Sequence, residues 1–249
     1  MTPHIPFKRN VVDPVQCIKD GWEIIKGRYW LFVGITAVGV LIAGAVPMWI
    51  LMGPMMCGIN LAFFKQRRGE PVEFADLFKG FDYFGPSLIA TLLYALPIMA
   101  VVIPGYIFFY VGMILSMVAQ GASEEPSPGP ALGVFFMFMI LIMVILAVIL
   151  LISVGFTFAY PLIVDRKVPG FDAVKLSFRA AMANFWRLLA MTVLTGLLGL
   201  AGYLVFCLGM FLVMPITYAA IDVAYEQVFG LHNPAEDHSN LPPPPPVFT

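Results

Sequence analysis

The chain has 249 residues, of which 60% are hydrophobic and only 12% are charged. The charged share is about half that of a soluble domain, and the mean hydropathy is +0.90. A soluble domain of this length needs far more polar surface to cover its core. The composition therefore excludes an ordinary cytosolic enzyme, a disordered chain and a nucleic-acid-binding protein, and it indicates an all-α polytopic membrane protein.

An amphipathic helix is predicted over residues 13–28. It begins at Asp13-Pro14, a good helix N-cap followed by proline at the first helical position. Its apolar face contains Val15, Ile18, Trp22, Ile25 and Tyr29. We expect this helix to lie in the cytoplasmic membrane interface. No cleavable signal peptide is expected, because the first 28 residues have no short apolar core.

Four runs without charge, each longer than the roughly 20 residues needed to cross a bilayer, cover 29–64, 83–123, 126–164 and 188–221. The Lys and Arg residues fall in three clusters outside these runs, the first of them before residue 29, whereas residues 120–130 contain two Glu and no basic residue. Basic residues favour the cytoplasmic side of a membrane. The pattern therefore predicts cytoplasmic basic clusters and an external loop at 120–130.

Six transmembrane helices with both termini in the cytoplasm satisfy this placement. The runs 29–64 and 188–221 start and end on one side, so each is predicted to form a hairpin, with turns near Pro47 and near Cys207–Gly209. The other two runs cross once each. Residues 87–119 and 131–164 would each be about 50 Å long as helices, so we expect tilting or kinks at Pro97, Pro104 and Pro161.

An internal repeat is suggested by residues 13–69 and 169–230. A shift of 156 carries the apolar face of the first predicted helix onto Phe171, Val174, Phe178, Ala181 and Phe185. PMMCGINLAFFKQRRG (54–69) then aligns with PITYAAIDVAYEQVFG (215–230), pairing Gly69 with Gly230. The units are parallel repeats, and a third copy over 72–119 is a weaker alternative.

Three stretches carry a family resemblance: GINLAFFKQRRGEPVEFADLFKGF, PLIVDRKVPGFDAVKLSFRAAMANFWRLL and GMFLVMPITYAAIDVAYEQVFG. Across about residues 13–230 the chain resembles bacterial six-helix membrane families of unknown function. Related membrane modules are fused to some glycerophosphodiester phosphodiesterases, whose catalytic domain the chain lacks. The resemblance implies a bacterial inner membrane and supplies no catalytic residues.

Asp222 is the most notable ionisable residue, about two turns inside the predicted cytoplasmic end of the last helix. Glu226 follows at i+4, and Asn60 of the first unit aligns one place from Asp222. Acids within membrane helices are costly and often functional. We expect either pairing with a nearby basic residue, or a polar site for a proton, ion or substrate.

The basic clusters also have two interpretations. They set the topology and attract anionic lipid, or they form a head-group pocket, for which Arg67, Arg68, Arg166 and Lys167 are the candidates.

No catalytic, metal or cofactor site is predicted. Cys17, Cys57 and Cys207 have no metal-binding spacing, and His4, His232 and His238 lie in the terminal segments. Ser116 and Ser153 lie within apolar runs without a His nearby in sequence. Ser153 is expected to bond a backbone carbonyl group.

The expected organisation is one membrane domain over 1–230 and a disordered, cytoplasmic Pro-rich tail over 231–249. The leading hypothesis is a non-enzymatic accessory or scaffold protein that binds membrane lipids or other membrane proteins. The alternative is a transporter or lipid-handling protein that uses the Asp222 region and the basic clusters.

Overall fold

The computed structural model describes residues 5–45, 50–121, 129–205 and 209–231, and all regular elements within these ranges are helical. In chain order they are α1 (Pro14–Ile25), the 3-10 helix η1 (Lys26–Arg28), α2 (Tyr29–Ala45), α3 (Met52–Arg67), the 3-10 helix η3 (Phe74–Tyr83), α4 (Phe84–Gly121), α5 (Gly129–Phe156), α6 (Ala159–Arg166), α7 (Gly170–Ala183), α8 (Phe185–Val205) and α9 (Gly209–Phe229). The all-α fold class is confirmed.

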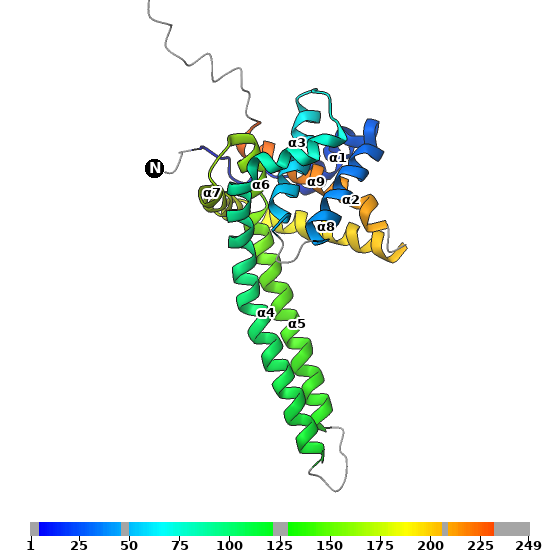
Figure 1. Cartoon of the computed structure of the whole chain (residues 1–249), viewed down its shortest axis with the longest axis vertical. Coiled ribbons are helices and arrows are strands. Elements are labelled where there is room, and N and C mark those ends of the chain that lie inside the picture. Colours follow the sequence, from blue (N-terminus) through cyan, green and yellow to red (C-terminus); the bar gives the residue numbers. More distant parts are fainter. Residues whose placement is uncertain (1–4, 46–49, 122–128, 206–208, 232–249) are drawn as a thin grey trace, which may run out of the picture.

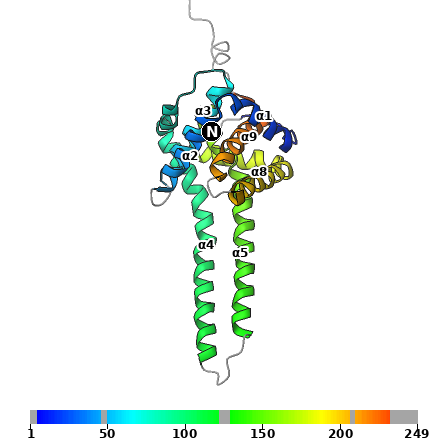
Figure 2. The same cartoon turned by 90° about the vertical axis from the view of Figure 1, so that its right-hand side faces the viewer.

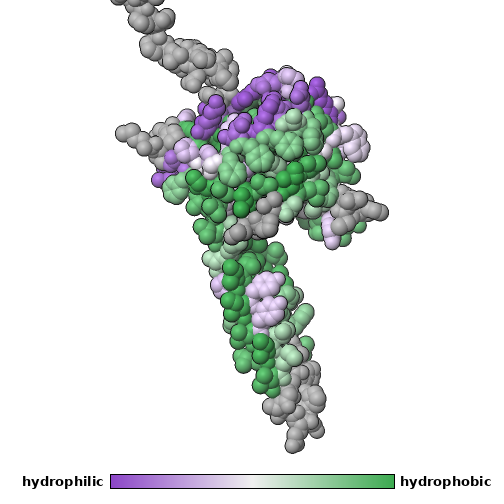
Figure 3. All heavy atoms as spheres, viewed as in Figure 1, coloured by the Kyte–Doolittle hydropathy of each residue, from purple (hydrophilic) through white to green (hydrophobic). Residues whose placement is uncertain are grey.

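Two parts make up the molecule: a helical head and a long antiparallel hairpin of α4 and α5 that extends from it (Figures 1 and 2). The remaining helices pack in the head, and α8 runs crosswise to the long hairpin (Figure 1). The hydrophilic surface gathers on the side of the head away from the hairpin (Figure 3). The distribution of polarity is therefore strongly one-sided.

Most of the hairpin surface seen in Figure 3 is hydrophobic, with a small pale-purple patch midway along it. Helix α4 has 38 residues and α5 has 28, which at 1.5 Å per residue correspond to about 57 Å and 42 Å. Side chains such as Phe108, Leu115 and Met143 are at least 62% exposed. A surface of this kind is typical of a membrane-embedded hairpin. Pro97 and Pro104, expected to kink the chain, lie within an uninterrupted helix α4.

The second of the two long predicted helices, over 131–164, is interrupted at Thr157–Phe158, between α5 and α6. Pro161, expected to kink this run, is the third residue of α6, and the break lies just before that helix. Proline is tolerated in the first turn, where backbone N–H groups have no partner within the helix.

Helix α1 begins as predicted. The Asp13 carboxylate accepts hydrogen bonds from the backbone N–H groups of Val15 and Gln16, each at 3.1 Å. Its buried side overlaps the predicted apolar face at Ile25. Cys17 and Gly21 are also buried and pack against α9, while Val15 and Trp22 of the predicted face remain exposed. Gly21 permits this contact, since a Cβ atom there would lie 2.9 Å from the Ala220 nitrogen.

The middle segment ahead of α4 forms the 3-10 helix η3, capped by reciprocal hydrogen bonds between Glu73 and Asp76. It packs closely on α3. A Cβ atom at Gly58 would overlap the carbonyl oxygen of Leu77, and one at Gly80 would overlap that of Pro54. Two glycines thus allow backbone-to-backbone contact between η3 and α3.

Two helical hairpins, α2–α3 and α8–α9, occur where the sequence predicts them. Gly202 and Gly209 bring α8 and α9 into close contact near their connection, since a Cβ atom at Gly202 would lie 2.8 Å from the carbonyl oxygen of Gly209. The turns expected at Pro47 and Cys207 lie in residues 46–49 and 206–208, outside the described residues.

Four stretches among the described residues are long and apolar enough to cross a membrane: Pro14–Ala45, Phe74–Val118, Leu132–Arg166 and Phe185–Leu204. The six predicted passes include α3 and α9, which are not among these four. Helix α3 instead forms the centre of the head, with its side chains buried from Gly53 to Asn60.

Candidate functional site: a hydroxyl-lined cavity

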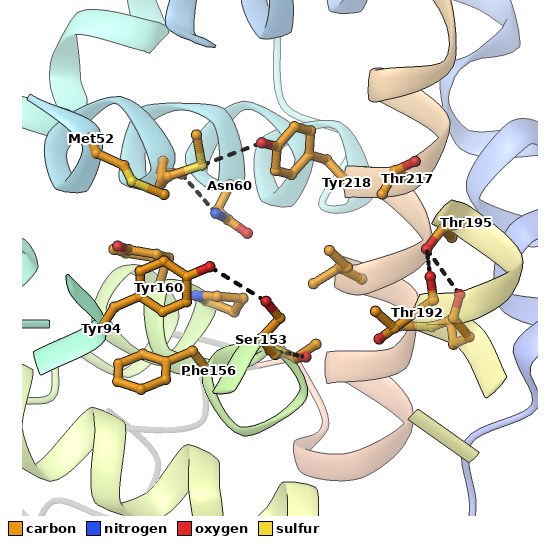
Figure 4. Close-up of a pocket in the computed structure, with 15 residues that line it drawn as sticks. Met52, Asn60, Tyr94, Ser153, Phe156, Tyr160, Thr192, Thr195, Thr217 and Tyr218 are labelled. Atoms are coloured by element: carbon orange, nitrogen blue, oxygen red, sulfur yellow. Dashed lines mark hydrogen bonds between the residues drawn. The ribbon is translucent and has the colours of Figure 1, made fainter. Parts of the chain in front are cut away.

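A cavity of about 300 Å³ lies where α3, α4, α5, α6, α8 and α9 meet (Figure 4). Its wall consists of Met52, Met56, Asn60, Tyr94, Ser153, Phe156, Thr157, Tyr160, Pro161, Met191, Thr192, Thr195, Thr217, Tyr218 and Ile221. Many of these side chains carry a hydroxyl or amide group, and none carries a charge. We call this space the polar chamber.

The break between α5 and α6 gives the polar chamber one of its walls. The Ser177 hydroxyl of α7 accepts a hydrogen bond from the Phe158 N–H at 3.1 Å and donates one to the Gly155 carbonyl at 2.7 Å. These bonds satisfy backbone groups that the interrupted helix leaves free. The break is thereby held in place, with Ser153 and Tyr160 on its two sides.

Hydrogen bonds within the wall leave acceptor capacity toward the polar chamber. Tyr94 and Ser153 share a 3.4 Å contact between their hydroxyl oxygens, so the expected bond from Ser153 to a backbone carbonyl is not the one observed. Asn60 donates to the Met56 carbonyl at 2.7 Å, and its own carbonyl oxygen points into the chamber (Figure 4). Thr192 and Thr195 donate to carbonyl groups four residues earlier in α8.

A second, apolar chamber of about 340 Å³ adjoins the first. Its wall consists of Val40, Ala43, Gly44, Met52, Met56, Tyr94, Met214 and Tyr218. Met52, Met56, Tyr94 and Tyr218 belong to both walls. The two chambers are therefore adjacent and share part of their walls, and we call them together the two-part site.

Asp222 lies one helical turn beyond Tyr218 on α9 and does not line either chamber. Only 3% of the residue is exposed, and neither carboxylate oxygen has a hydrogen-bond partner in the structure. Arg67 attracts its charge and Asp165 repels it. The structure brings Asn60 to the polar chamber but leaves Asp222 behind its wall.

Glu226 pairs with Arg67, as a bridge between α9 and α3. Arg67 thus forms its ion pair with Glu226, and it also attracts the Asp222 charge without a hydrogen bond to that carboxylate.

Asp165 pairs with the other two arginines among the head-group candidates. It forms ion pairs with Arg68 at 2.7 Å and with Arg166 at 3.2 Å, and it accepts a hydrogen bond from the Tyr225 hydroxyl at 2.9 Å. Arg166 also donates to the carbonyl of Gly230 at 3.0 Å. Lys167, the fourth candidate, is exposed at the end of α6. Three of the four predicted head-group contacts therefore bind protein groups.

The remaining candidate residues are three cysteines and three histidines. Cys17 and Cys57 are buried free thiols. Cys207 and the three histidines lie outside the described residues. Within the part of the chain that the structure describes, no group of three or more His, Cys, Asp or Glu side chains could hold a metal ion.

The sequence profile of DUF975, described as a protein of unknown function, matches residues 14–231. The chain belongs to DUF975. No curated protein and no solved structure matches it. Membership in DUF975 agrees with the expected resemblance to a membrane family of unknown function and adds no activity.

Sequence reasoning did not predict the polar chamber of this DUF975 protein. A signal was present: hydroxyl residues recur at helical spacing inside charge-free runs, as Ser153 with Thr157 and Thr192 with Thr195. Such residues usually bond their own helix. Only the convergence of six helices shows that they face a common space.

Proposed function

We propose that the protein is an integral membrane protein that takes a membrane-borne molecule into the polar chamber, as a transporter or lipid-handling protein. The polar chamber carries this proposal. Protein interiors are close-packed, and polar groups inside a membrane-embedded bundle usually satisfy one another. A charge-free space of about 300 Å³ with hydroxyl and amide groups on its wall has the character of a ligand pocket.

The role proposed is not catalytic. The one serine in the chamber wall, Ser153, faces the phenol of Tyr94. Activation of a serine nucleophile needs a neighbouring base, and a phenol is a poor one. Binding, rather than bond cleavage, is what this arrangement supports.

We place the protein in a bacterial inner membrane with the hydrophilic side of the head toward the cytoplasm. The α4–α5 hairpin supplies two passes. The α2–α3 and α8–α9 hairpins are proposed to enter the membrane and return, giving six passes with both termini cytoplasmic. The basic residues on the head support this orientation, and the crosswise direction of α8 (Figure 1) implies a strong tilt for the last hairpin.

The internal repeat is retained as a proposal. The order of one short helix followed by a helical hairpin occurs as α1–α2–α3 and again as α7–α8–α9. The aligned residues Gly69 and Gly230 both adopt positive φ, at 72° and 70°. Lys167, at the end of α6, also has positive φ, at 51°. A third helix end with this conformation favours a middle repeat unit over 74–167 rather than over 72–119. The relation to phosphodiesterase-fused modules stays a proposal from sequence.

The proposed function can be tested by filling the polar chamber with a larger side chain. Wild-type protein in nanodiscs should retain a bound small molecule by native mass spectrometry, whereas Thr192→Phe should lose it because the ring occupies the chamber. Leu204→Phe is the matched control, since Leu204 lies on the same helix and is 75% exposed. Equal retention by both variants, or no bound or exchangeable molecule in the wild type, would reject a ligand role for the chamber.

A scaffold role is the second candidate, supported by exposed aromatic side chains on the head. Trp30 at the start of α2 is 75% exposed, and Trp186 at the start of α8 is 79% exposed. Tryptophan favours the membrane interface, where it can also contact a neighbouring protein. Under this role, replacement of Trp30 and Trp186 by Leu would disperse a defined complex that Thr192→Phe leaves intact.

A further inference from the structure

The wall of the polar chamber is uncharged, and hydroxyl and amide groups are set into a surface that is mostly apolar. Asn60 presents a carbonyl oxygen, and the hydroxyls of Thr192, Thr195 and Thr217 lie on the opposite side (Figure 4). Hydroxyl and amide groups recognise hydroxyl or carbonyl groups of a ligand. A ligand charge would find no counter-ion in this wall and would lose its hydration on entry, which is costly.

The wall of the adjoining apolar chamber indicates the chemistry of the other part of the ligand. Its wall contains Val40, Ala43 and Met214 and shares two methionines with the polar chamber. Methionine side chains adapt to flexible apolar chains. A molecule that fills both chambers needs a polar end and a hydrocarbon end.

The arginines that would recognise an anionic head group are engaged elsewhere. Arg67 pairs with Glu226, and Arg68 and Arg166 pair with Asp165. None of these side chains belongs to either chamber wall. A phosphate group in the site would therefore face hydroxyls alone, without the cationic partners that phosphate recognition normally uses.

We propose that the two-part site binds a neutral amphiphile: a lipid with an uncharged, hydroxyl-bearing head group in the polar chamber and an acyl chain entering the apolar chamber. This inference rests on the proposed function and names its ligand class. Monoacylglycerol has this chemistry, and lysophosphatidic acid with the same chain differs from it by a phosphate group.

Photolabelling tests the ligand class. The full-length protein is placed in phosphatidylcholine nanodiscs, because sugar detergents are themselves neutral hydroxylated amphiphiles and would compete. A monoacylglycerol with a diazirine on its acyl chain should label peptides that contain Val40–Gly44 or Met214. Unlabelled monoacylglycerol should suppress this labelling at concentrations at least about tenfold lower than lysophosphatidic acid, which corresponds to about 1.4 kcal/mol.

Threonine variants test the role of the chamber hydroxyls. Thr192→Val and Thr195→Val should each weaken labelling about fivefold, the effect of one net hydrogen bond. Thr36→Val is the matched control. Thr36 is also buried and donates to the carbonyl four residues earlier, Phe32, at 2.8 Å, but it lines neither chamber. It should leave labelling unchanged.

The outcomes separate the two proposals. Equal or better competition by lysophosphatidic acid would overturn the neutral ligand class and leave the proposed function standing. Labelling confined to the lipid-facing α4–α5 hairpin, unaffected by the threonine variants, would overturn the two-part site. If Thr192→Phe also fails to change any bound species, the proposed function fails with it.

Discussion

Asp165 and Arg68, 97 residues apart in the chain, form an ion pair at 2.7 Å that joins the last turn of α6 to the C-cap of α3. The Asp165 side chain is fully buried, and Arg166 and Tyr225 bind it as well. One carboxylate therefore connects three helices of the head: α3, α6 and α9.

Replacement of Asp165 by Asn should destabilise the protein strongly. Arg68 and Arg166 would lose the anion that balances them, and removal of one partner from a buried ion pair costs about 3 kcal/mol or more. Thermal unfolding of the purified protein in nanodiscs, followed by circular dichroism, would measure the change as a lower Tm.

Asp222→Asn is the informative companion, because Asp222 is also buried but has no hydrogen-bond partner for either oxygen. A neutral amide avoids the cost of an unpaired buried carboxylate. We expect the same or a higher Tm. A loss as large as that of Asp165→Asn would mean that Asp222 has a structural partner and that the unpaired description is wrong.

The contact between η3 and α3 should not tolerate one added methyl group. Gly58→Ala would place its Cβ against the Leu77 carbonyl oxygen, and Gly80→Ala would do so against that of Pro54. Both neighbours are backbone atoms and cannot rotate away, so we expect at least about 3 kcal/mol of destabilisation. The yield of monodisperse protein by size-exclusion chromatography would report it.

Gly196→Ala serves as the control for these glycine substitutions. No atom lies within 4 Å of a Cβ atom at Gly196, and alanine in a helix is favoured over glycine by about 0.8 kcal/mol. This variant should be as stable as the wild type or more so. Equal tolerance of Gly58→Ala would contradict the close contact.

Charge placement was enough to predict much of the fold. The gaps between basic residues locate both hairpins and the long α4–α5 pair, and Asp13-Pro14 marks the start of α1. These features depend on neighbouring residues and on the solvent, and both can be inferred from a single sequence.

The break after Thr157 and the cavity beside it depend on partners far away in the chain. Ser177 holds the break from 19 residues downstream. Pro161 in the apolar run 126–164 indicates a perturbed helix nearby but not this partner. Arg67 forms its ion pair with Glu226 and not with Asp222, although both acids belong to α9. A shared helix face in sequence does not determine which of two acids a cation reaches.

The left-handed residue at the end of α6 offers a stabilising substitution. Lys167 has φ 51°, a conformation that costs most L-residues about 1 kcal/mol and glycine little. Lys167→Gly should therefore raise the Tm. Gly69→Ala and Gly230→Ala should lower the stability by about 1 kcal/mol each, since both have positive φ and no neighbour within 4 Å of a Cβ atom. Opposite signs at these positions would contradict the shared helix-end conformation.

Cys207 provides a native test of the six-pass topology. Cys17 and Cys57 are buried with 0% exposure, so a hydrophilic maleimide should react with them slowly in folded protein. Six passes place the connection between α8 and α9 on the external side, opposite the basic clusters. In intact spheroplasts, wild-type protein should then be labelled by an impermeant maleimide from outside, and Cys207→Ser should not be. A cysteine introduced at Lys19 should react only after the membrane is permeabilised. Labelling of Cys207 only after permeabilisation would show that the α8–α9 hairpin does not reach the external side of the membrane. The protein would then have fewer than six passes.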